Sequence, residues 1–212
     1  MQRDANSIKA ATEIDSDAPL EEDLKLGARI RSLRQERKLS LQLLASRAEL
    51  SVGMISQIER GLSSPSLRSL RLLGSALGVP ISLFFDMPPE AANGESKYVV
   101  RRRGRRVLRL TPTGVRKELL SPDRDGRLME LYELVLQAGG SSGQDFYQHE
   151  GEKAGVVTSG QIRLWIEEQE FLLSAGDSFQ FASTLPHKFD NPGQQSARLL
   201  WINSPPIPRR KP

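Results

Sequence analysis

The sequence predicts a multidomain α + β protein, in which a small helical domain precedes an all-β domain. Residues 24–85 form short segments with apolar side chains at helical spacing, whereas residues 127–203 hold short apolar runs separated by turns. The charge also changes sign: residues 24–85 carry ten Lys or Arg against three Asp or Glu, and residues 118–203 carry six against thirteen. A basic domain joined to an acidic one indicates that the first meets a polyanion and the second does not.

Composition narrows the class of protein. The chain has 212 residues, of which 38% are hydrophobic, and this content suffices for two small cores. It contains no cysteine, which excludes disulfides and thiolate metal sites and fits a reducing compartment. No apolar run approaches the roughly 20 residues that a bilayer span needs, and the N-terminus lacks the apolar core of a signal peptide. We therefore expect a cytoplasmic protein with no membrane partner.

A polar arm precedes the first predicted helix. Residues 1–23 hold seven acidic and two basic residues, with few large apolar groups to offset the entropy of ordering them, so we expect a disordered arm. A first helix is predicted over about 24–38, because Leu26, Ile30 and Leu33 fall on one stripe.

Two short helices with a tight turn between them follow. Ser40 can cap a helix in which Leu43, Leu44 and Ala48 repeat at helical spacing. Only Leu50 and Ser51 separate this helix from the next one, which lies in the segment 51–61; that segment starts with a capping serine and ends with a glycine. Two short helices joined in this way form a helix-turn-helix.

The segment 51–61 is predicted to be a recognition helix that lies in the major groove of DNA. Ile55 and Ile58 lie three residues apart and share a buried face. The opposite face carries short or hydrogen-bonding side chains, which, with the positive helix N-terminus, suit the major groove and phosphates. Val52, Ser56 and Gln57 are predicted to contact base edges. The other residues of the predicted surface are expected to contact the phosphate backbone. The predicted DNA-binding residues are Ser40, Gln42, Arg47, Ser51, Val52, Gly53, Ser56, Gln57, Arg60, Ser63 and Ser64.

The rest of the helical domain completes a family pattern. Ser66 can cap a helix that ends at Gly78, and Pro80 starts a short fifth helix, ISLFF. Residues 26–85 resemble the phage-repressor-like (XRE) helix-turn-helix domain, a five-helix DNA-binding module. The resemblance rests on three runs, which are RSLRQERKLSLQLLA, ISQIERG and PSLRSLRLLGSALGV.

This resemblance also implies one structural ion pair. In that family an Arg at the position of Arg34 pairs with a Glu at the position of Glu59, which clamps the first helix to the recognition helix. Several members carry a Gln where Leu41 stands, so the DNA contact made by that Gln is expected to be absent here.

A linker and a basic stretch separate the helical domain from the β domain. Residues 86–96 contain two prolines and a glycine and predict an interdomain linker. Residues 97–117 carry nine basic and no acidic residues, and their Val, Tyr and Leu content favours strands. We interpret them as a charge-guarded edge strand, with extra phosphate contacts as the alternative. The β domain is predicted over 97–205, followed by a disordered basic tail, 206–212.

Two runs in the β domain, HEGEKAGVVTSGQ and AGDSFQFASTLPHKFDN, resemble the motifs of the cupin barrel, a double-stranded β-helix jelly roll with a central cavity. Metal-binding cupins take two His and one Glu from the first motif and a third His from the second. Here Tyr147 and Lys153 replace one His and the Glu, so only His149 and His187 remain. Two imidazoles beside an ammonium make a poor site for a divalent ion, and we expect no metal or other cofactor.

Six residues are expected to bind a ligand inside the barrel. The two His and the aromatic residues can enclose a small polar ligand, and an acidic side chain among the six can pair with an amine. Packing in the core is an equal alternative for Trp165 and Tyr132. The predicted ligand-binding residues are Glu130, Tyr132, Tyr147, His149, Trp165 and His187.

Together the two halves are similar to helix-turn-helix/cupin regulators, which include putrescine-responsive repressors. The resemblance implies a one-component transcriptional regulator without enzyme activity. It implies a homodimer on a pseudo-palindromic operator in double-stranded DNA, with recognition helices about 34 Å apart. A small molecule, such as a polyamine or an amino acid, would bind in the barrel. Two alternatives stay open: a cupin metalloenzyme with an accessory helix-turn-helix domain, and an antitoxin-like DNA-binding protein with a protein partner.

Overall fold

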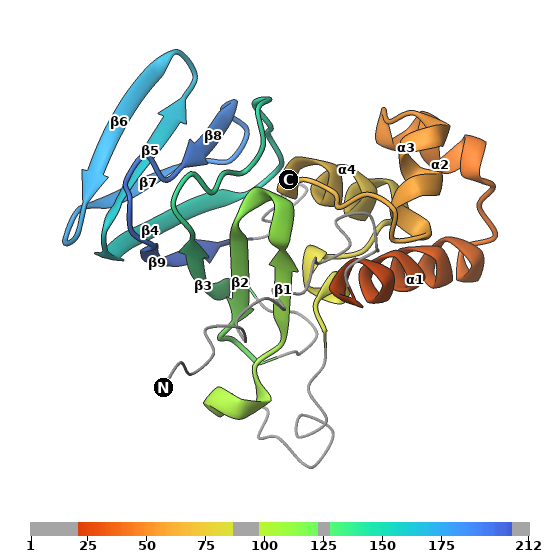
Figure 1. The fold of residues 1–212 in the computed structure, drawn as a ribbon, viewed down its shortest axis with the longest axis horizontal. Coiled ribbons are helices and arrows are strands. Elements are labelled where there is room, and N and C mark those ends of the chain that lie inside the picture. The colour runs from red at the N-terminus through yellow and green to blue at the C-terminus, as the bar shows by residue number, and fades with distance from the viewer. Residues whose placement is uncertain (1–20, 87–97, 123–127, 205–212) are drawn as a thin grey trace, which may run out of the picture.

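The fold is seen in a computed structural model (Figure 1), which describes residues 21–86, 98–122 and 128–204. Helices fill the N-terminal part and two antiparallel sheets fill the C-terminal part, so the predicted α + β class is confirmed. Most of the predicted arm, the predicted linker and the predicted tail lie outside the described residues. No helix within these ranges has the length and apolarity to cross a membrane.

The helical domain consists of α1 (Glu21–Glu36), α2 (Leu41–Ala48), α3 (Val52–Glu59), α4 (Leu67–Leu77) and the 3₁₀ turn η1 (Ile81–Phe84). The fifth helix predicted from ISLFF is thus only a 3₁₀ turn. It stops there because Phe85 adopts an extended backbone conformation and leads Asp86 into a β-bridge with Val107. The end of the helical domain is therefore joined to the first strand of the β domain.

Serines cap three of these helices as predicted. The hydroxyl groups of Ser40, Ser51 and Ser66 each accept a hydrogen bond of 3.1 Å from a backbone N–H in the first helical turn. Between α2 and α3 the chain turns within a few residues, because Glu49 adopts the left-handed backbone conformation at φ 53°. The caps and this turn fix the orientation of α3 relative to α2.

Two details of the helices differ from the sequence-based expectation. Helix α1 begins at Glu21, inside the segment predicted to be a disordered arm, because its first turn carries three acidic residues that favour a helix N-terminus. On α2, Leu43 is 43% exposed although its spacing placed it with Leu44 and Ala48. Adjacent residues are about 100° apart around a helix, and the buried stripe runs through Leu44, Ala45 and Ala48 instead.

The β domain contains nine strands among the described residues. These are β1 (Val107–Leu110), β2 (Val115–Leu119), β3 (Glu130–Leu136), β4 (Glu152–Ser159), β5 (Gln161–Ile166), β6 (Gln169–Ser174), β7 (Ser178–Ala182), β8 (His187–Asp190) and β9 (Ala197–Asn203). Six strands pair in the order β1-β2-β3-β9-β4-β7, and three pair in the order β6-β5-β8. Short 3₁₀ turns, η3 (Arg102–Gly104) and η4 (Thr111–Thr113), flank β1. The strand predicted at the basic stretch is present, and β1 lies at an edge of the larger sheet.

The register of the larger sheet places polar side chains in its buried face. Lys153 on β4 lies opposite Phe181 on β7 and Asn203 on β9, and Asn203 lies opposite Glu130 on β3. Paired residues on neighbouring strands point to the same face, so these four side chains form one row across the sheet. The neighbouring row on the same face of the sheet contains Trp201, which is 2% exposed. The sheet therefore carries a polar row beside an aromatic core.

The two domains pack against each other, and α4 is the helix nearest the sheets (Figure 1). Phe85 lies beside Tyr132 with 5.7 Å between ring centroids, and the Ser82 hydroxyl donates to Glu130 Oε1 at 3.3 Å. One apolar core extends through both domains. The position of the helical domain is thus coupled to the interior of the β domain.

Candidate DNA-binding surface and buried polar site

Helix α3 has one buried and one exposed face. Ile55 and Ile58 are buried at 0% and 1% exposure, as their spacing predicted. Gly53 is exposed, and a Cβ atom built on it would meet nothing within 4 Å. The glycine is therefore not required by packing within the chain, and it leaves room for close approach by another molecule.

The predicted DNA-binding residues gather around this face. The exposed members are Ser40, Gln42, Arg47, Ser51, Val52, Gly53, Gln57 and Arg60, and the half-buried members are Ser56, Ser63 and Ser64. Arg60 Nε donates to the Ser56 carbonyl at 3.2 Å, so its side chain folds back along α3. The hydroxyl of Ser64 is used inside the domain, where it donates to Asp23. In this conformation the Ser64 hydroxyl proton is therefore already used, and a phosphate contact by Ser64 stays a prediction that requires this bond to break.

An ion pair holds α3 against α1. Arg34 Nε and Nη2 donate to the two carboxylate oxygens of Glu59 at 2.6 and 2.8 Å, and Arg34 Nη1 donates to the Leu39 carbonyl at 2.9 Å. The pair that the family resemblance implied is thus present in bidentate form. Close backbone contact adds to it: a Cβ on Gly27 would lie 2.2 Å from the Ile58 carbonyl oxygen. Sequence reasoning missed Gly27, since a lone glycine in a helix has many explanations.

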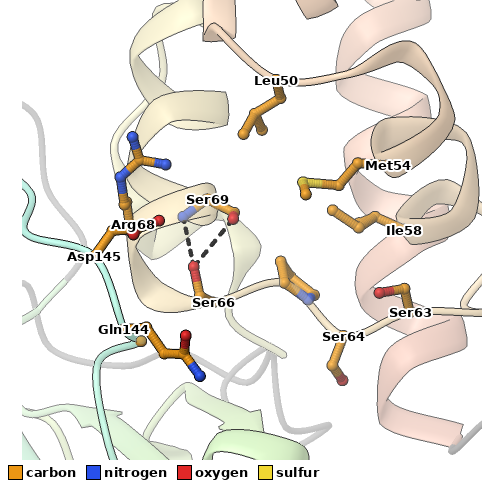
Figure 2. A pocket seen from close by; sticks show the side chains of 12 residues that line it. Leu50, Met54, Ile58, Ser63, Ser64, Ser66, Arg68, Ser69, Gln144 and Asp145 are labelled. Carbon is orange, nitrogen blue, oxygen red and sulfur yellow. Dashed lines mark hydrogen bonds between the residues drawn. The ribbon is translucent and has the colours of Figure 1, made fainter.

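A hollow of about 290 Å³ lies beside α3, at the boundary between the domains (Figure 2). Its lining includes Met54 of α3, which is 42% exposed, and a loop of the β domain around Gln144. The same loop contacts the start of α4, because a Cβ on Gly143 would lie 3.3 Å from Ser66 Cβ. The β domain thus reaches the edge of the DNA-binding surface.

A second polar site is buried between the sheets of the β domain. Lys153 is fully buried, and its Nζ donates to the hydroxyl of Tyr147 at 3.2 Å and to His187 Nε2. His187 can accept this bond because its Nδ1 carries the proton that it donates to the Leu185 carbonyl at 2.6 Å. His149 is adjacent, with its ring centroid 5.8 Å from that of His187. Four residues of the two sequence motifs therefore meet at one point.

Burial and positive charge shift the pKa values at this site. The pKa of Lys153 is well below its usual value because the ammonium is desolvated, and the charge of Arg71 lowers it further. Desolvation, followed by the Lys153 charge, lowers the pKa of His187 to about 3, and desolvation followed by the Arg71 charge lowers that of His149. Burial raises the pKa of Tyr147 to about 12. Both imidazoles are thus neutral near pH 7.

Two cationic residues at this site were not predicted. Arg71 belongs to α4 of the helical domain, and its guanidinium lies 5.9 Å from the Tyr147 ring centroid. Lys117 of β2 is 2% exposed, with its ammonium 3.7 Å from the Tyr132 ring centroid. The basic stretch was interpreted as a solvated edge strand, which is wrong for Lys117: it lies on β2, which pairs with both β1 and β3, and its side chain is buried. No sequence signal linked Arg71 to the β domain, since only the docking of α4 brings it there.

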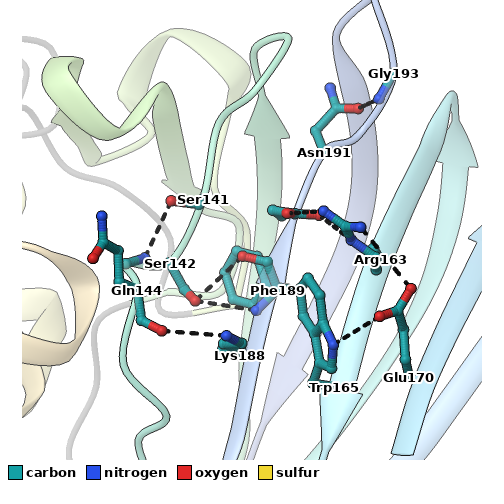
Figure 3. A network of polar contacts seen from close by, with 12 residues as sticks. Ser141, Ser142, Gln144, Arg163, Trp165, Glu170, Lys188, Phe189, Asn191 and Gly193 are labelled. Atoms are coloured by element: carbon teal, nitrogen blue, oxygen red, sulfur yellow. Dashed lines mark hydrogen bonds and ion pairs between the residues drawn. The ribbon is translucent and has the colours of Figure 1, made fainter.

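The remaining predicted ligand-binding residues divide into two groups. Tyr132 is fully buried and donates to Oε2 of the half-buried Glu130 at 2.5 Å. Trp165 does not lie inside and is a correction to the prediction. It alternates with buried Leu164 along β5 and points outward, where its Nε1 donates to Glu170 at 3.0 Å (Figure 3). Alternation along a strand shows which residues share a face, but it does not show which of the two faces points into the domain until the strand register is known.

The buried polar site does not suit a divalent metal ion. No group of three or more His, Cys, Asp or Glu residues that could hold such an ion occurs in the part of the chain that the structure describes. The Nε2 atom of His187, which would have to bind the metal, already accepts from the Lys153 ammonium. A cation held at a ligand atom excludes a second cation from it.

Comparisons with known proteins agree with this architecture. The family model described as helix-turn-helix matches residues 30–84, and the family model described as cupin domain matches residues 132–203. The chain joins a helix-turn-helix domain to a cupin domain. It is 28% identical over 185 residues to the HTH-type transcriptional regulator PuuR of Escherichia coli K12, covering 87% of this chain and 97% of PuuR.

Two further relatives share both domains. The HTH-type transcriptional regulator SutR of Escherichia coli K12 is 28% identical over 175 residues, which cover 82% of this chain and 91% of SutR. The crystal structure of a helix-turn-helix family transcriptional regulator from Vibrio cholerae superposes with a TM-score of 0.66 at 23% identity, over 87% of this chain and 97% of the other. The first of these two proteins aligns along most of this chain, and the second shares the fold of both domains.

Proposed function

We propose that this protein is a one-component transcriptional regulator, whose helix-turn-helix domain reads double-stranded DNA and whose cupin domain binds a small-molecule effector. The observation that carries the proposal is the exposed polar face of α3, which Arg34 and Glu59 hold in place. Homology to transcriptional regulators along most of the chain supports it. A helix presented in this way enters the major groove with its N-terminal residues toward the base edges.

We propose a homodimer as the DNA-binding form. One α3 helix contacts a short half-site, and a second copy places an equivalent helix about one turn of DNA away on a pseudo-palindrome. Val52, Ser56 and Gln57 read bases, while Arg47, Ser63 and the helix N-terminus at Ser51 position the phosphates.

A non-enzymatic role is part of the proposal. The metalloenzyme alternative needs a metal ion, and the buried polar site holds an ammonium at the atom where such an ion would bind. Metal analysis of the purified protein tests this directly, because stoichiometric metal bound at His187 would restore the enzyme alternative.

The experiment that tests DNA reading is selection from random double-stranded DNA at near-physiological salt, followed by affinity measurements on the selected and a scrambled duplex. Gln57→Ala should weaken binding to the selected sequence by about 1–3 kcal/mol and leave binding to the scrambled one nearly unchanged. Gln169→Ala, on exposed strand β6, is the matched control and should change neither. Equal losses on both duplexes, or no selected sequence, would contradict the proposal. Copurification of a protein needed for DNA binding would favour the antitoxin-like alternative.

A further inference from the structure

Three cationic side chains gather at one end of the cupin interior. Lys153 and Lys117 belong to the cupin domain, and Arg71 comes from α4 of the helix-turn-helix domain. Within the described residues, no carboxylate forms an ion pair with any of the three. The carboxylate of Glu130 acts on Lys117 only at longer range and accepts from Tyr132 and Ser82. Buried positive charge without a counterion is costly, and an anion is its natural complement.

Unused hydrogen-bonding atoms surround the same cluster. The buried atoms Arg71 Nε, Ser183 Oγ and Asn203 Nδ2 have no hydrogen-bond partner in the described part of the chain. Asn203 is the cross-strand neighbour of Lys153, and the Ser183 carbonyl accepts from the backbone N–H of His149 at 2.9 Å. All three side-chain atoms can donate, so they complement the oxygens of an anion.

One unused atom has the opposite character. His149 Nδ1 lies 2.8 Å from the Glu150 carbonyl oxygen, which can only accept, so this nitrogen carries the proton. The buried Nε2 of neutral His149, which has no hydrogen-bond partner among the described residues, is therefore an acceptor. A ligand that satisfies the site must carry a hydrogen-bond donor in addition to its anionic group.

Aromatic rings form the walls of the cluster. The Lys153 ammonium lies 4.4 Å from the Tyr147 ring centroid and 5.4 Å from that of Trp201, and the Phe181 ring lies 5.0 Å from that of His187. Such walls suit the carbon skeleton of an organic molecule better than a fully hydrated inorganic ion.

Resting on the proposed function, we propose that the effector is a small hydroxycarboxylate, whose carboxylate binds Arg71 and Lys153 and whose hydroxyl donates to His149 Nε2. Because Arg71 belongs to α4, the ligand contacts both domains at once. Binding therefore depends on how the helix-turn-helix domain docks on the cupin domain. By linkage, the ligand increases the population of the docking arrangement that it binds more tightly. The DNA affinity of the protein then shifts towards the affinity of that arrangement.

A second connection between the site and the DNA-binding domain runs through residues 141–149. Tyr147 and His187 exchange two backbone hydrogen bonds of 3.1 and 3.0 Å, which tie this segment to the site. Lys188 Nζ donates to the Gln144 carbonyl at 3.3 Å (Figure 3), and the adjacent Gly143 contacts Ser66 at the start of α4. This segment is therefore held at one end by the buried polar site and at the other by α4.

The test is calorimetric titration of the full-length protein with lactate, malate and citrate, with phosphate, sulfate and putrescine as comparison ligands. We expect at least one hydroxycarboxylate to bind, and the bound anion should stabilise the protonated form of Lys153, whose pKa is lowered by burial. Affinity should then fall as the pH rises. Binding of putrescine alone, or of the inorganic anions alone, would overturn the assignment, as would no binding by any of the six.

Variants locate the site. Lys153→Met and Arg71→Gln should each weaken the binding of the hydroxycarboxylate by at least about tenfold. Lys25→Met, at an exposed position of α1, and Arg68→Gln, one turn from Arg71, are the matched controls and should bind normally. Equal affinity in Lys153→Met and the wild type would contradict the site. Thermal unfolding of every variant distinguishes loss of binding from loss of fold.

The coupling between ligand binding and DNA binding is measured with the DNA sequence obtained from the selection experiment. The hydroxycarboxylate should change the affinity of the wild-type protein for that DNA, and the change should disappear in Arg71→Gln. If ligand binds but the protein has no preferred DNA sequence, the proposed regulatory function fails while the binding site stands. If specific DNA binding persists and no anion binds, the present inference fails alone.

Discussion

Each domain buries charge, and the two do so in opposite ways. In the helix-turn-helix domain, Arg34 and Glu59 are nearly buried and use both carboxylate oxygens in a bidentate pair. In the cupin domain, fully buried Lys153 forms its hydrogen bonds, among the described residues, to two neutral partners, Tyr147 and His187. A completed pair fixes the arrangement of two helices, whereas an incomplete one leaves free energy available for a ligand. The Arg34–Glu59 pair therefore acts as a structural clamp, whereas Lys153 is suited to bind a ligand.

Breaking the completed pair should have the largest effect on stability. Glu59→Ala leaves the Arg34 guanidinium buried without its counterion, so we expect the free energy of unfolding to fall by roughly 3 kcal/mol in urea titrations. Glu21→Ala removes a carboxylate from the exposed pair with Lys25 at the frayed start of α1 and serves as the control, for which we expect a much smaller change. A loss in Glu59→Ala no greater than in the control would mean that the pair does not clamp α1 to α3.

Removing the unpaired charge should act in the opposite direction. Lys153→Met replaces a desolvated ammonium by an apolar side chain of similar length, so the free energy of unfolding should rise by about 1 kcal/mol or more at pH 7. The same urea titration measures it. A destabilised Lys153→Met protein would show that the bonds to Tyr147 and His187 outweigh the desolvation of the ammonium, and the contrast between the domains would disappear.

Acid should destabilise the cupin domain selectively. Both histidines of the chain lie there, and the pKa of His187 is lowered to about 3 by burial and by the Lys153 charge. The unfolded chain therefore binds protons first, and stability is lost as the pH falls from about 6.5 towards 3. Both tryptophans also lie in the cupin domain, so their fluorescence follows its unfolding in urea at successive pH values. In Lys153→Met the loss should be smaller, and an unchanged loss would assign it to other groups.

The smallest expected effect tests the exposed face of α3. Gly53→Ala should leave stability unchanged or raise it by at most about 1 kcal/mol, because alanine favours helix and a Cβ there meets nothing within 4 Å. It should nevertheless weaken binding to the selected DNA, if the DNA backbone or a base edge approaches that position. Ser75→Ala, exposed on α4, is the control. Undiminished DNA binding by Gly53→Ala would place the contact elsewhere on α3.

Local patterns predicted most of the fold because local physics determines it. The serine caps, the apolar faces of α1 and α3, and the order of helices before strands all depend on residues close together in sequence. The family motifs likewise placed Tyr147, His149, Lys153 and His187 together. What the sequence did not predict depends on register and docking: the outward face of Trp165, the burial of Lys117, and the presence of Arg71 beside the Tyr147 ring.

The amine expectation illustrates the same limit. Glu130 suggested an amine ligand because it is an acidic side chain on a strand of an acidic domain. In the folded chain its two oxygens accept from Tyr132 and Ser82, while the buried side chains that lack a counterion are cationic. Net charge counted along the sequence was dominated by exposed residues, so it did not reveal the buried Lys117 and Lys153.

The origin of Arg71 in α4 has a consequence for how such regulators can be recombined. A chimera that joins this cupin domain to the helix-turn-helix domain of another regulator would lose one wall of its own receptor, even with the linker cut at the most convenient residue. Biosensors assembled from interchangeable halves would therefore need the arginine, and the helix face that presents it, transplanted together with the barrel.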